Sequence, residues 1–459
     1  MKRTDTVPGE KWYGKFVKNN TAGKKQTIAR KYTEKKQLHG SQPGYPSQER
    51  FRAADAKLIT VTHLFNASAV PDDARKVLDN FSAIVQGVFP SNSRQLRSLP
   101  LDIRQLSHEL TDERAVRRLG YMNNPAYISA YVRYFTWWNL VRLTRLFANL
   151  GSRSFPLKDG DYCLDIGSGP LTVVTALWLA CPELRNRKLT WYCMDISQNV
   201  LSTGEDIYLS AAARTPPADS NAEPHWNIIR IKGPMGTNIR EKASFITCAN
   251  MFNELYQDGQ FTPEELAQKY AAALRSYADT KHTVFVVEPG VPRQARIISL
   301  LRDSFIKSGM AITAPCPHVQ ACAMNGLHAR TGGTAKWCNF AFSTEDAPQE
   351  LLKLSADAGI PKERAVLSFV LATTATPEVV QSRQTCESPL TLRITSDPIR
   401  LPGHRTGYYA CSTLGLTLAV DVSECRYKSG DNVTVKTSGD LRTLRKDAKT
   451  GAKELSIEE

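Results

Sequence analysis

The chain has 459 residues, more than the usual single domain, so two or three domains are expected. Its 42% hydrophobic residues suffice for a sizeable core, while no run approaches the roughly 20 apolar residues that cross a bilayer, so we expect no membrane span. The net charge of +14 excludes neither enzymes nor binding proteins but favours an anionic partner, most often nucleic acid.

The first 48 residues mix lysine with glycine, threonine, glutamine and proline, a composition typical of a disordered basic arm. Within the first fifty residues, 12 Lys and Arg stand against 4 Asp and Glu, a net charge of +8. Such an arm can attract phosphates without reading sequence, although it could also be a solvated tail that aids solubility. We expect no secretory signal, because the start of the chain is charged and lacks an apolar segment.

Residues 49–150 have apolar residues at helical spacing and predict a helical N-terminal domain. A capping signal at Thr111 is followed by several arginines, and further helices are expected over 124–138 and 140–150. An aromatic cluster here could stack on bases, but we favour a face on which the domain packs against its neighbour. The cluster comprises Tyr131, Tyr134, Phe135, Trp137 and Trp138.

Residues 161–171 predict a short buried strand, a glycine turn and a helix that begins near Pro170. Asp165 ends the strand, and Gly167 and Gly169 let the backbone turn sharply and approach a ligand closely. This D-x-G-x-G turn resembles the first motif of Rossmann-like methyltransferases, which bind S-adenosylmethionine there. The alternative is an ordinary strand-to-helix turn that contains glycines.

After this turn strands and helices alternate, which predicts a parallel α/β sheet. The expected strands cover 189–195, 227–232, 244–250 and 283–288, and the expected helices begin near Ser197 and cover 263–278 and 293–308.

Polar residues follow two of these strands at the carboxyl edge of the predicted sheet, where doubly wound folds bind ligands. Asp195 ends the second strand, in the position of an acid that binds ribose hydroxyls, although it could instead cap the next helix. Asn250, Asn253 and Glu254 follow the fourth strand. Asn253 and Glu254 are candidates for a catalytic base by location only, so the catalytic residues stay unassigned.

Residues 309–345 break the alternation and carry Cys316, Cys322 and Cys338, separated by five and fifteen residues. Converging thiolates bind zinc or iron–sulfur clusters, so we expect a cysteine-rich metal-binding insert. Incidental loop thiols are the alternative, because the spacing matches no standard motif, including that of radical S-adenosylmethionine enzymes. A fourth ligand would come from Cys411, Cys386, Cys425, His318 or His404.

The other cysteines are expected to be thiols, because no secretion signal places the chain in an oxidising compartment. Cys163, Cys193 and Cys248 fall within predicted strands, where free thiols behave as small buried hydrophobic groups.

The chain therefore divides into six expected parts. Residues 1–48 form the arm, 49–150 the helical domain, 151–308 the Rossmann-like domain and 309–345 the insert. Residues 346–425 contain strands at 365–373 and 408–413 that close the sheet as a hairpin, and 426–459 form a polar tail.

Several motifs together resemble those of the small-ribosomal-subunit assembly methyltransferase-like family, whose mitochondrial members are known as methyltransferase-like protein seventeen and which also has bacterial members. They are L-T-x-x-R-A from Leu110, L-D-I-G-S-G-P from Leu164, N-E-L from Asn253, V-E-P-G from Val287, C-P-H-x-x-x-C from Cys316, W-C-x-F from Trp337 and G-Y-x-x-C from Gly407. The resemblance covers about 95–425.

This resemblance implies an α/β fold with a Rossmann-like class I methyltransferase sheet and association with the small ribosomal subunit or its rRNA. By motif it implies S-adenosylmethionine binding by the residues Asp165, Gly167, Ser168, Gly169, Asp195 and Asn250. It also implies a [4Fe–4S] cluster, with zinc as the alternative, on Cys316, Cys322, Cys338 and Cys411. Two residues depart from the pattern: Asn339 replaces a histidine, and Val291 replaces a threonine.

Three functions remain open from the sequence. The first is an S-adenosylmethionine-dependent rRNA methyltransferase or methyltransferase-like factor in ribosome assembly and translation, and the second is a non-catalytic rRNA-binding assembly factor that uses the fold as a scaffold. The third and weakest is a small-molecule methyltransferase, against which the basic charge counts. We expect a monomer in the bacterial cytoplasm, with the mitochondrial matrix as the alternative, since the acidic residues of the arm argue against a transit peptide.

Overall fold

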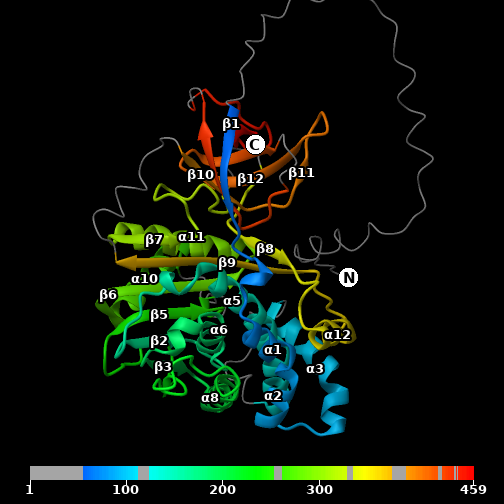
Figure 1. Cartoon of the computed structure of the whole chain (residues 1–459), viewed down its shortest axis with the longest axis vertical. Coiled ribbons are helices and arrows are strands. Elements are labelled where there is room, and N and C mark those ends of the chain that lie inside the picture. Colours follow the sequence, from blue (N-terminus) through cyan, green and yellow to red (C-terminus); the bar gives the residue numbers. More distant parts are fainter. Residues whose placement is uncertain are drawn as a thin grey trace, which may run out of the picture. The chain divides into compact units, whose positions relative to one another are not determined.

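Two β-sheets, one of eight strands and one of seven, organise the part of the chain that the structure describes (Figure 1). The computed structural model describes residues 55–111, 124–252, 261–327, 334–374, 389–421, 426–438, 441 and 443–458. The basic arm expected over 1–48 lies outside these residues. No described helix combines the length and the apolar character that crossing a bilayer requires.

The eight-stranded sheet has the order β4-β3-β2-β5-β6-β9-β7, with β8 paired to β9. Its strands are β2 (Tyr162–Ile166), β3 (Thr190–Asp195), β4 (Asn227–Lys232), β5 (Ala243–Ala249), β6 (Ala278–Pro289), β7 (Met310–Ala314), β8 (Phe340–Ser343) and β9 (Arg364–Thr374). Strands β2 to β6 are parallel, whereas β9 runs antiparallel to its neighbours. The strand order reverses between β2 and β5, so the carboxyl ends of these two strands form a switch point where doubly wound sheets bind ligands.

Helices cover both faces of this sheet, which is why its central strands are apolar on both sides. One face packs against α5 (Thr136–Leu150), α6 (Thr172–Ala180) and α8 (Gln198–Ala212), and the other against α10 (Pro263–Tyr277) and α11 (Pro292–Lys307). Two short helices, α7 (Pro182–Arg185) and α12 (Gln349–Asp357), lie in connections. The prediction of an α/β fold with a Rossmann-like parallel sheet is confirmed by this order.

The predicted aromatic cluster packs the helices before the sheet against one another and against α12. These helices are α1 (Asp72–Asp79), α2 (Phe81–Val88), α3 (Ser93–Thr111) and α4 (Pro125–Ala130), and a π-helical turn at Tyr131–Phe135 leads into α5. Trp137 and Trp138 are buried, and their indole N–H groups donate to Leu78 O at 2.8 Å and to Ser355 Oγ at 3.1 Å. These rings are therefore unavailable to bases. Trp138 contacts a neighbouring part of the chain, as expected, whereas Trp137 bonds within the helical region. The arginines after Thr111 lie outside the described residues.

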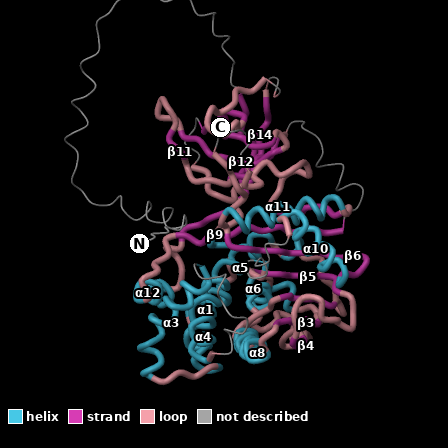
Figure 2. Tube along the Cα trace, turned by 180° about the vertical axis from the view of Figure 1, so that it is seen from behind, coloured by secondary structure: helices cyan, strands magenta, loops and turns pink. Residues whose placement is uncertain are grey.

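The seven-stranded sheet was not foreseen. It consists of β1 (Asp55–Thr62), β10 (Leu390–Ile394), β11 (Ile399–Arg400), β12 (Thr406–Ser412), β13 (Gly415–Asp421), β14 (Asn432–Thr437) and β15 (Lys453–Glu458). Its order is β10-β14-β1-β15-β13-β12-β11, and an additional pairing of β10 with β12 closes six strands into a barrel. Figure 2 shows these strands apart from the helices that cover the other sheet.

Four expectations are corrected by this architecture. The segment expected to be a helical domain from residue 49 first contributes β1 to the barrel, and the expected polar tail over 426–459 contributes β14 and β15. Alternating buried residues such as Val433 and Val435 explain why the tail forms strands. The strand expected over 408–413 belongs to the barrel, so the parallel sheet is closed by β9 and β7 instead. The insert over 309–345, expected to be irregular, holds β7 and β8 at its ends.

Candidate functional site

The glycine turn lies at the carboxyl end of β2 and folds back onto β3. Gly167 and Gly169 have φ angles of 71° and 50°, in the left-handed region that favours glycine. The N–H groups of Gly167 and Ser168 both donate to Met194 O, at 2.8 and 3.0 Å. Leu171 also has a positive φ of 52°, so α6 begins at Thr172 and not at Pro170 as expected. The turn is thus held by hydrogen bonds within the chain.

Asp195 joins the glycine turn to the start of α8. Its Oδ2 accepts from the N–H of Gly169 at 3.0 Å, and its Oδ1 accepts from the N–H of Ser197 at 2.9 Å. Burial raises the pKa of Asp195, although these hydrogen bonds act in the opposite direction. Each carboxylate oxygen has a second lone pair, so the capping interaction seen here leaves acceptor capacity for a ligand hydroxyl.

Asp165 is the most perturbed acid at this edge of the sheet. Its side chain is 1% exposed, and its Oδ1 accepts from Thr247 Oγ1 at 2.6 Å. Its Oδ2 is buried and has no hydrogen-bond partner among the described residues. Burial raises the pKa of Asp165 to about 7. Because buried polar atoms in folded proteins are usually paired, an unpartnered oxygen beside a ligand-binding turn fits a missing donor or cation.

The segment after β5 closes over the turn. Asn250 has a φ of 57°. Two residues later, the N–H of Phe252 donates to Oε1 of the buried Glu288, on the neighbouring strand β6, at 2.9 Å. A Cβ on Gly167 would lie 3.1–3.3 Å from the side chain of Met251, so methionine already covers that glycine. The candidate bases Asn253 and Glu254 lie outside the described residues.

Several residues that shape this site were not predicted from the sequence. Thr247 donates to Asp165 at the end of β2, and Glu288 accepts from Phe252 N–H in the segment after β5. The V-E-P-G motif was the only signal for Glu288. Gly204 in α8 approaches the turn so closely that a Cβ there would lie 2.4 Å from the carbonyl carbon of Pro170. A single glycine within a helical pattern gives no warning of such an approach.

The four cysteines named from the family resemblance line one cavity. Cys316 follows β7 and Cys338 precedes β8, and both strands pair with β9. Cys322 lies on the connecting loop, and Cys411 comes from β12 of the barrel. All four line the same cavity, which therefore lies between the parallel sheet and the barrel.

Charged side chains accompany these thiols. Arg302 of α11 donates through Nε to Cys316 Sγ at 3.2 Å, and Arg393 of β10 also lines the cavity. Burial raises the pKa of Cys338 and Cys411 well above the ordinary value of 9.0, so both groups are neutral thiols without a metal. Neither arginine was foreseen, because nothing in the sequence marks them.

His318 contacts one of the thiols directly. Its Nε2 lies 2.9 Å from Cys411 Sγ, and Arg302 Nη2 faces its Nδ1 at 3.5 Å. Since a guanidinium can only donate, the geometry favours an accepting Nδ1 and an Nε2–H that donates to sulfur. Burial, together with the charge of Arg302, lowers the pKa of His318 to about 4, so the ring is neutral.

The described side chains do not form the metal-ion site that we expected at the cysteines. Among the described residues, no group of three or more His, Cys, Asp or Glu side chains is placed to hold a metal ion. Of the alternative fourth ligands, Cys386 and Cys425 lie outside the described residues, and His404 does not line the cavity. Cys163, Cys193 and Cys248 are buried in strands, as expected of structural thiols.

The two departures from the family pattern lie near these sites. Val291 is the N-cap residue of α11 and makes no side-chain capping bond, whereas a threonine could accept from the helix. Asn339 lies between Cys338 and β8.

The chain matches one known protein family. Residues 153–398, more than half of the chain, match the family described as mitochondrial small ribosomal subunit Rsm22. None of the curated proteins matches the chain.

The chain is also similar to solved structures, and three of them are remote relatives. A SAM-dependent methyltransferase from Geobacter sulfurreducens in complex with S-adenosyl-L-homocysteine has 12% identity and a TM-score of 0.28, covering 52% of this chain and 90% of its own. YjhP from E. coli has 14% identity and a TM-score of 0.27, covering 59% and 100%. Precorrin-6y C5,15-methyltransferase from Geobacter metallireducens has 10% identity and a TM-score of 0.27, covering 49% and 85%. Because these TM-scores are too low to establish a shared fold, the fold assignment rests on the strand order of the parallel sheet.

Proposed function

Since the chain belongs to the family of mitochondrial small ribosomal subunit Rsm22, we propose that it binds S-adenosylmethionine at the glycine turn and acts on the small ribosomal subunit or its rRNA. The observation that carries the cofactor assignment is Asp165, with its buried, unpartnered Oδ2 beside a left-handed glycine turn at the switch point.

The residues present fit this cofactor. Asp165 would accept from its ammonium group and Asp195 from its ribose hydroxyls, while the backbone of Gly167 and Gly169 and the segment at Asn250 would border the methionine part. When bound, S-adenosylmethionine supplies an electrophilic methyl group on a sulfonium. Met251 packs on Gly167, so its side chain must turn aside for the cofactor to approach the turn.

Methyl transfer requires in-line positioning and exclusion of water more than a strong base. Asn253 and Glu254 are proposed as acceptor-side residues by position only. The second candidate, a non-catalytic assembly factor that uses the fold as scaffold, is favoured by the methionine over Gly167. A small-molecule methyltransferase is the weakest candidate, because the family description and the charge of +14 both point to a ribosomal partner.

Calorimetry with S-adenosylmethionine tests the cofactor proposal. Gly167→Arg should abolish binding, because the new side chain meets Met251 and fills the turn. Asp195→Ala should weaken binding by roughly 1–3 kcal/mol, the range for leaving a buried partner unpaired. Asp72→Asn, on an exposed helix start, is the control and should bind normally. Undiminished affinity in both site variants would remove the proposal.

The ribosomal part of the proposal is supported by the family description and by charge. Binding to small-subunit rRNA should weaken steeply with salt, since each neutralised phosphate releases counterions. Deleting residues 1–48 should lower the affinity and flatten the salt slope. An affinity independent of salt would contradict this part. The family description also favours the mitochondrial matrix over the bacterial cytoplasm that we preferred from the sequence.

We further propose that Cys316, Cys322, Cys338 and Cys411 hold a [4Fe–4S] cluster, with zinc as the alternative. The donor set supports this, because four thiols and two arginines share one cavity, and the guanidinium charges would offset those of bound thiolates. The cavity now measures about 10 Å³, so the loop carrying Cys322 must open to admit a group of several atoms. Such a centre would tie the parallel sheet to the barrel through Cys411, a structural role.

A further inference from the structure

The outward face of helix α3 carries basic side chains at helical spacing. Figure 1 shows this helix at the margin of the molecule, beside α12. Its inner face is buried through Leu99, Ile103 and Leu106. On the outer side, at about 100° per residue, five exposed residues fall within about 80° of the helix circumference, and none of them is acidic. They form the α3 face: Arg94, Arg97, Leu101, Arg104 and His108.

Two arginines of the α3 face have no counter-ion within the described part of the chain. Arg94 and Arg97 are exposed, and neither makes a hydrogen bond or an ion pair with a described residue. The acids of the helix are Asp102 and Glu109, which lie beside the face. Both accept hydrogen bonds from neighbouring side chains of α3, at 3.2 and 3.1 Å, so they do not neutralise these arginines.

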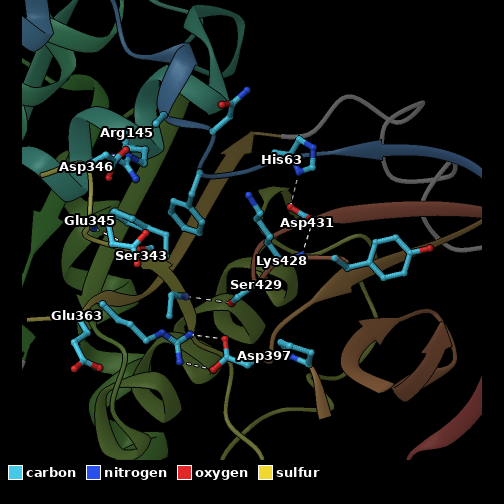
Figure 3. A pocket seen from close by; sticks show the side chains of 18 residues that line it. His63, Arg145, Ser343, Glu345, Asp346, Glu363, Asp397, Lys428, Ser429 and Asp431 are labelled. Carbon is cyan, nitrogen blue, oxygen red and sulfur yellow. Dashed lines mark hydrogen bonds and ion pairs between the residues drawn. The ribbon is translucent and has the colours of Figure 1, made fainter. Parts of the chain in front are cut away.

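Arginines elsewhere in the chain show the contrast. Along the cavity of about 850 Å³ between β8 and the barrel, Arg145 pairs with Asp346 and Arg364 pairs with Asp397 (Figure 3). A wall built from such pairs is largely neutral and attracts an anion little. The positive charge of the α3 face is not compensated in this way, so it is available to an anionic partner.

Arg104 is fixed at the inner end of its guanidinium. Its Nε donates at 2.8 Å to the carbonyl oxygen of Ala358, the C-cap residue of α12. Gly359 makes room for the group, since a Cβ there would lie 2.5 Å from Arg104 Nη2. Neither Nη1 nor Nη2 has an acceptor among the described residues. Arg104 therefore presents two donors at a fixed place, which is the arrangement that binds two oxygens of one phosphate.

The length of the α3 face selects a polymeric anion. From Arg94 to His108 it extends over about 21 Å of helix, too far for a single phosphate to meet all its cations. A DNA duplex carries a phosphate charge about every 1.7 Å of its axis, and an RNA duplex is comparably charged. The minor groove of duplex RNA is wide, shallow and lined by ribose, a surface that suits Leu101, whose side chain is 65% exposed between the arginines.

We propose that the α3 face binds the phosphate backbone of duplex rRNA across a minor groove. Arg94, Arg97 and Arg104 contact phosphates, and Leu101 lies against the sugars between them. This inference rests on the proposed association with the small ribosomal subunit and adds the surface and the RNA form through which it occurs. It does not depend on cofactor binding.

The test is fluorescence anisotropy of the full chain with a labelled RNA hairpin whose stem has about 16 base pairs, the length that a double-strand-binding domain spans. The double variant Arg94→Gln, Arg97→Gln should bind at least about tenfold more weakly at 0.1 M salt, and its slope of log affinity against log salt should flatten by about 1.8, because two phosphate contacts are lost. Its melting temperature should not change, since neither side chain bonds to a described residue.

The matched control is Arg187→Gln, Arg240→Gln, which removes the same charge from exposed positions before β3 and β5. It should keep the affinity and the slope of the unaltered chain. If the control weakens binding as much as the α3 variant does, net charge and not the α3 face explains the effect, and the inference is wrong.

Other outcomes separate this inference from the proposed function. RNA binding with full affinity and slope in the α3 variant would overturn the α3 face and leave the ribosomal proposal standing. No binding by the unaltered chain at any salt would contradict both. Equal sensitivity with single-stranded oligouridylate would overturn the duplex assignment, and tighter binding of an acidic helical peptide, lost in the same variant, would identify a protein as the occupant instead.

Discussion

The glycine turn and the cysteine cavity differ in how far the chain completes each of them. At the turn, backbone N–H groups are fixed by Met194 O and by the carboxylate of Asp195, and a single oxygen of Asp165 is left without a partner. At the cysteine cavity, four thiols and two arginines lie together, but no described group there is placed to hold a metal ion.

This difference follows from the parts of the fold that build the two sites. The turn belongs to one strand and the next, so the register of β2 and β3 determines it. The cysteine cavity draws on β7, β8 and the barrel strand β12, which belong to two sheets. A ligand at the turn would therefore bind to a structure that is already formed, whereas a metal at the cysteines would add a further connection between the two sheets.

The largest effect should come from the cysteines. Cys→Ser at 316, 322, 338 or 411 should each abolish the brown colour that the proposed cluster would give anaerobically purified protein, and lower its melting temperature by several degrees, since such a cluster would contribute folding free energy. Absorption spectra and iron and sulfide analysis measure the loss.

Cys248→Ala is the control, because Cys248 is a buried strand thiol away from the cavity, and it should keep the colour. Stoichiometric zinc without iron would replace the cluster by a zinc site. Full metal in Cys411→Ser would show that the fourth ligand is another group, for which His318 is the nearest candidate.

Asp165→Asn should raise the stability of the protein and lower its affinity for S-adenosylmethionine. Burial raises the pKa of Asp165 from 3.8 to about 7, so the native state holds this proton more tightly than the unfolded state does. The stability contributed by the group is present below pH 3.8 and is lost as the pH rises through about 7. The variant, which cannot ionise, should therefore gain up to about 4 kcal/mol over the unaltered protein between pH 4 and 8.

Urea unfolding at several pH values measures that gain, and calorimetry should show that the same variant loses affinity for S-adenosylmethionine. A stability difference that does not change with pH would mean that Asp165 is not held neutral by burial. An unchanged affinity would mean that the unpartnered oxygen does not face the cofactor.

A smaller effect is expected at Met251. If its side chain must turn aside for the cofactor, Met251→Ala should tighten S-adenosylmethionine binding by about 1 kcal/mol, roughly fivefold. Met251→Leu, which keeps the bulk, is the matched control. Weaker binding in the alanine variant would show that methionine forms part of the binding surface.

The smallest effect is expected at helix α11, which leads from the end of β6 to the cysteine cavity. Helix α11 starts after β6 at the uncapped Val291 and carries Arg302 to the cysteine cavity. Val291→Thr should stabilise the protein by about 0.5–1 kcal/mol, because a threonine at this position can accept from the first turn. Val291→Ala supplies no acceptor, so it should not stabilise the protein. Equal unfolding midpoints for the threonine and alanine variants would argue against the cap.

The sequence predicts the glycine turn well because its structure is local. The β2 and β3 strands, the turning glycines and the acid at 195 are all encoded within 35 residues, and β2 has the expected bounds. The barrel could not be predicted from local sequence, because its strands β1 and β14 are separated by almost the whole chain. The roles of Arg393 and Met251 depend likewise on contacts between distant segments, which periodicity and spacing do not report.

The central claim is that the cysteine centre stabilises the junction of sheet and barrel while the glycine turn stands without it. Hydrogen–deuterium exchange of anaerobic, metal-loaded protein and of Cys411→Ser tests this most directly. We expect faster exchange in the variant over 315–327, β8 and β12, with unchanged protection over 162–171. Equal protection everywhere would contradict a structural centre, and loss of protection at the glycine turn would contradict the separation of the two sites.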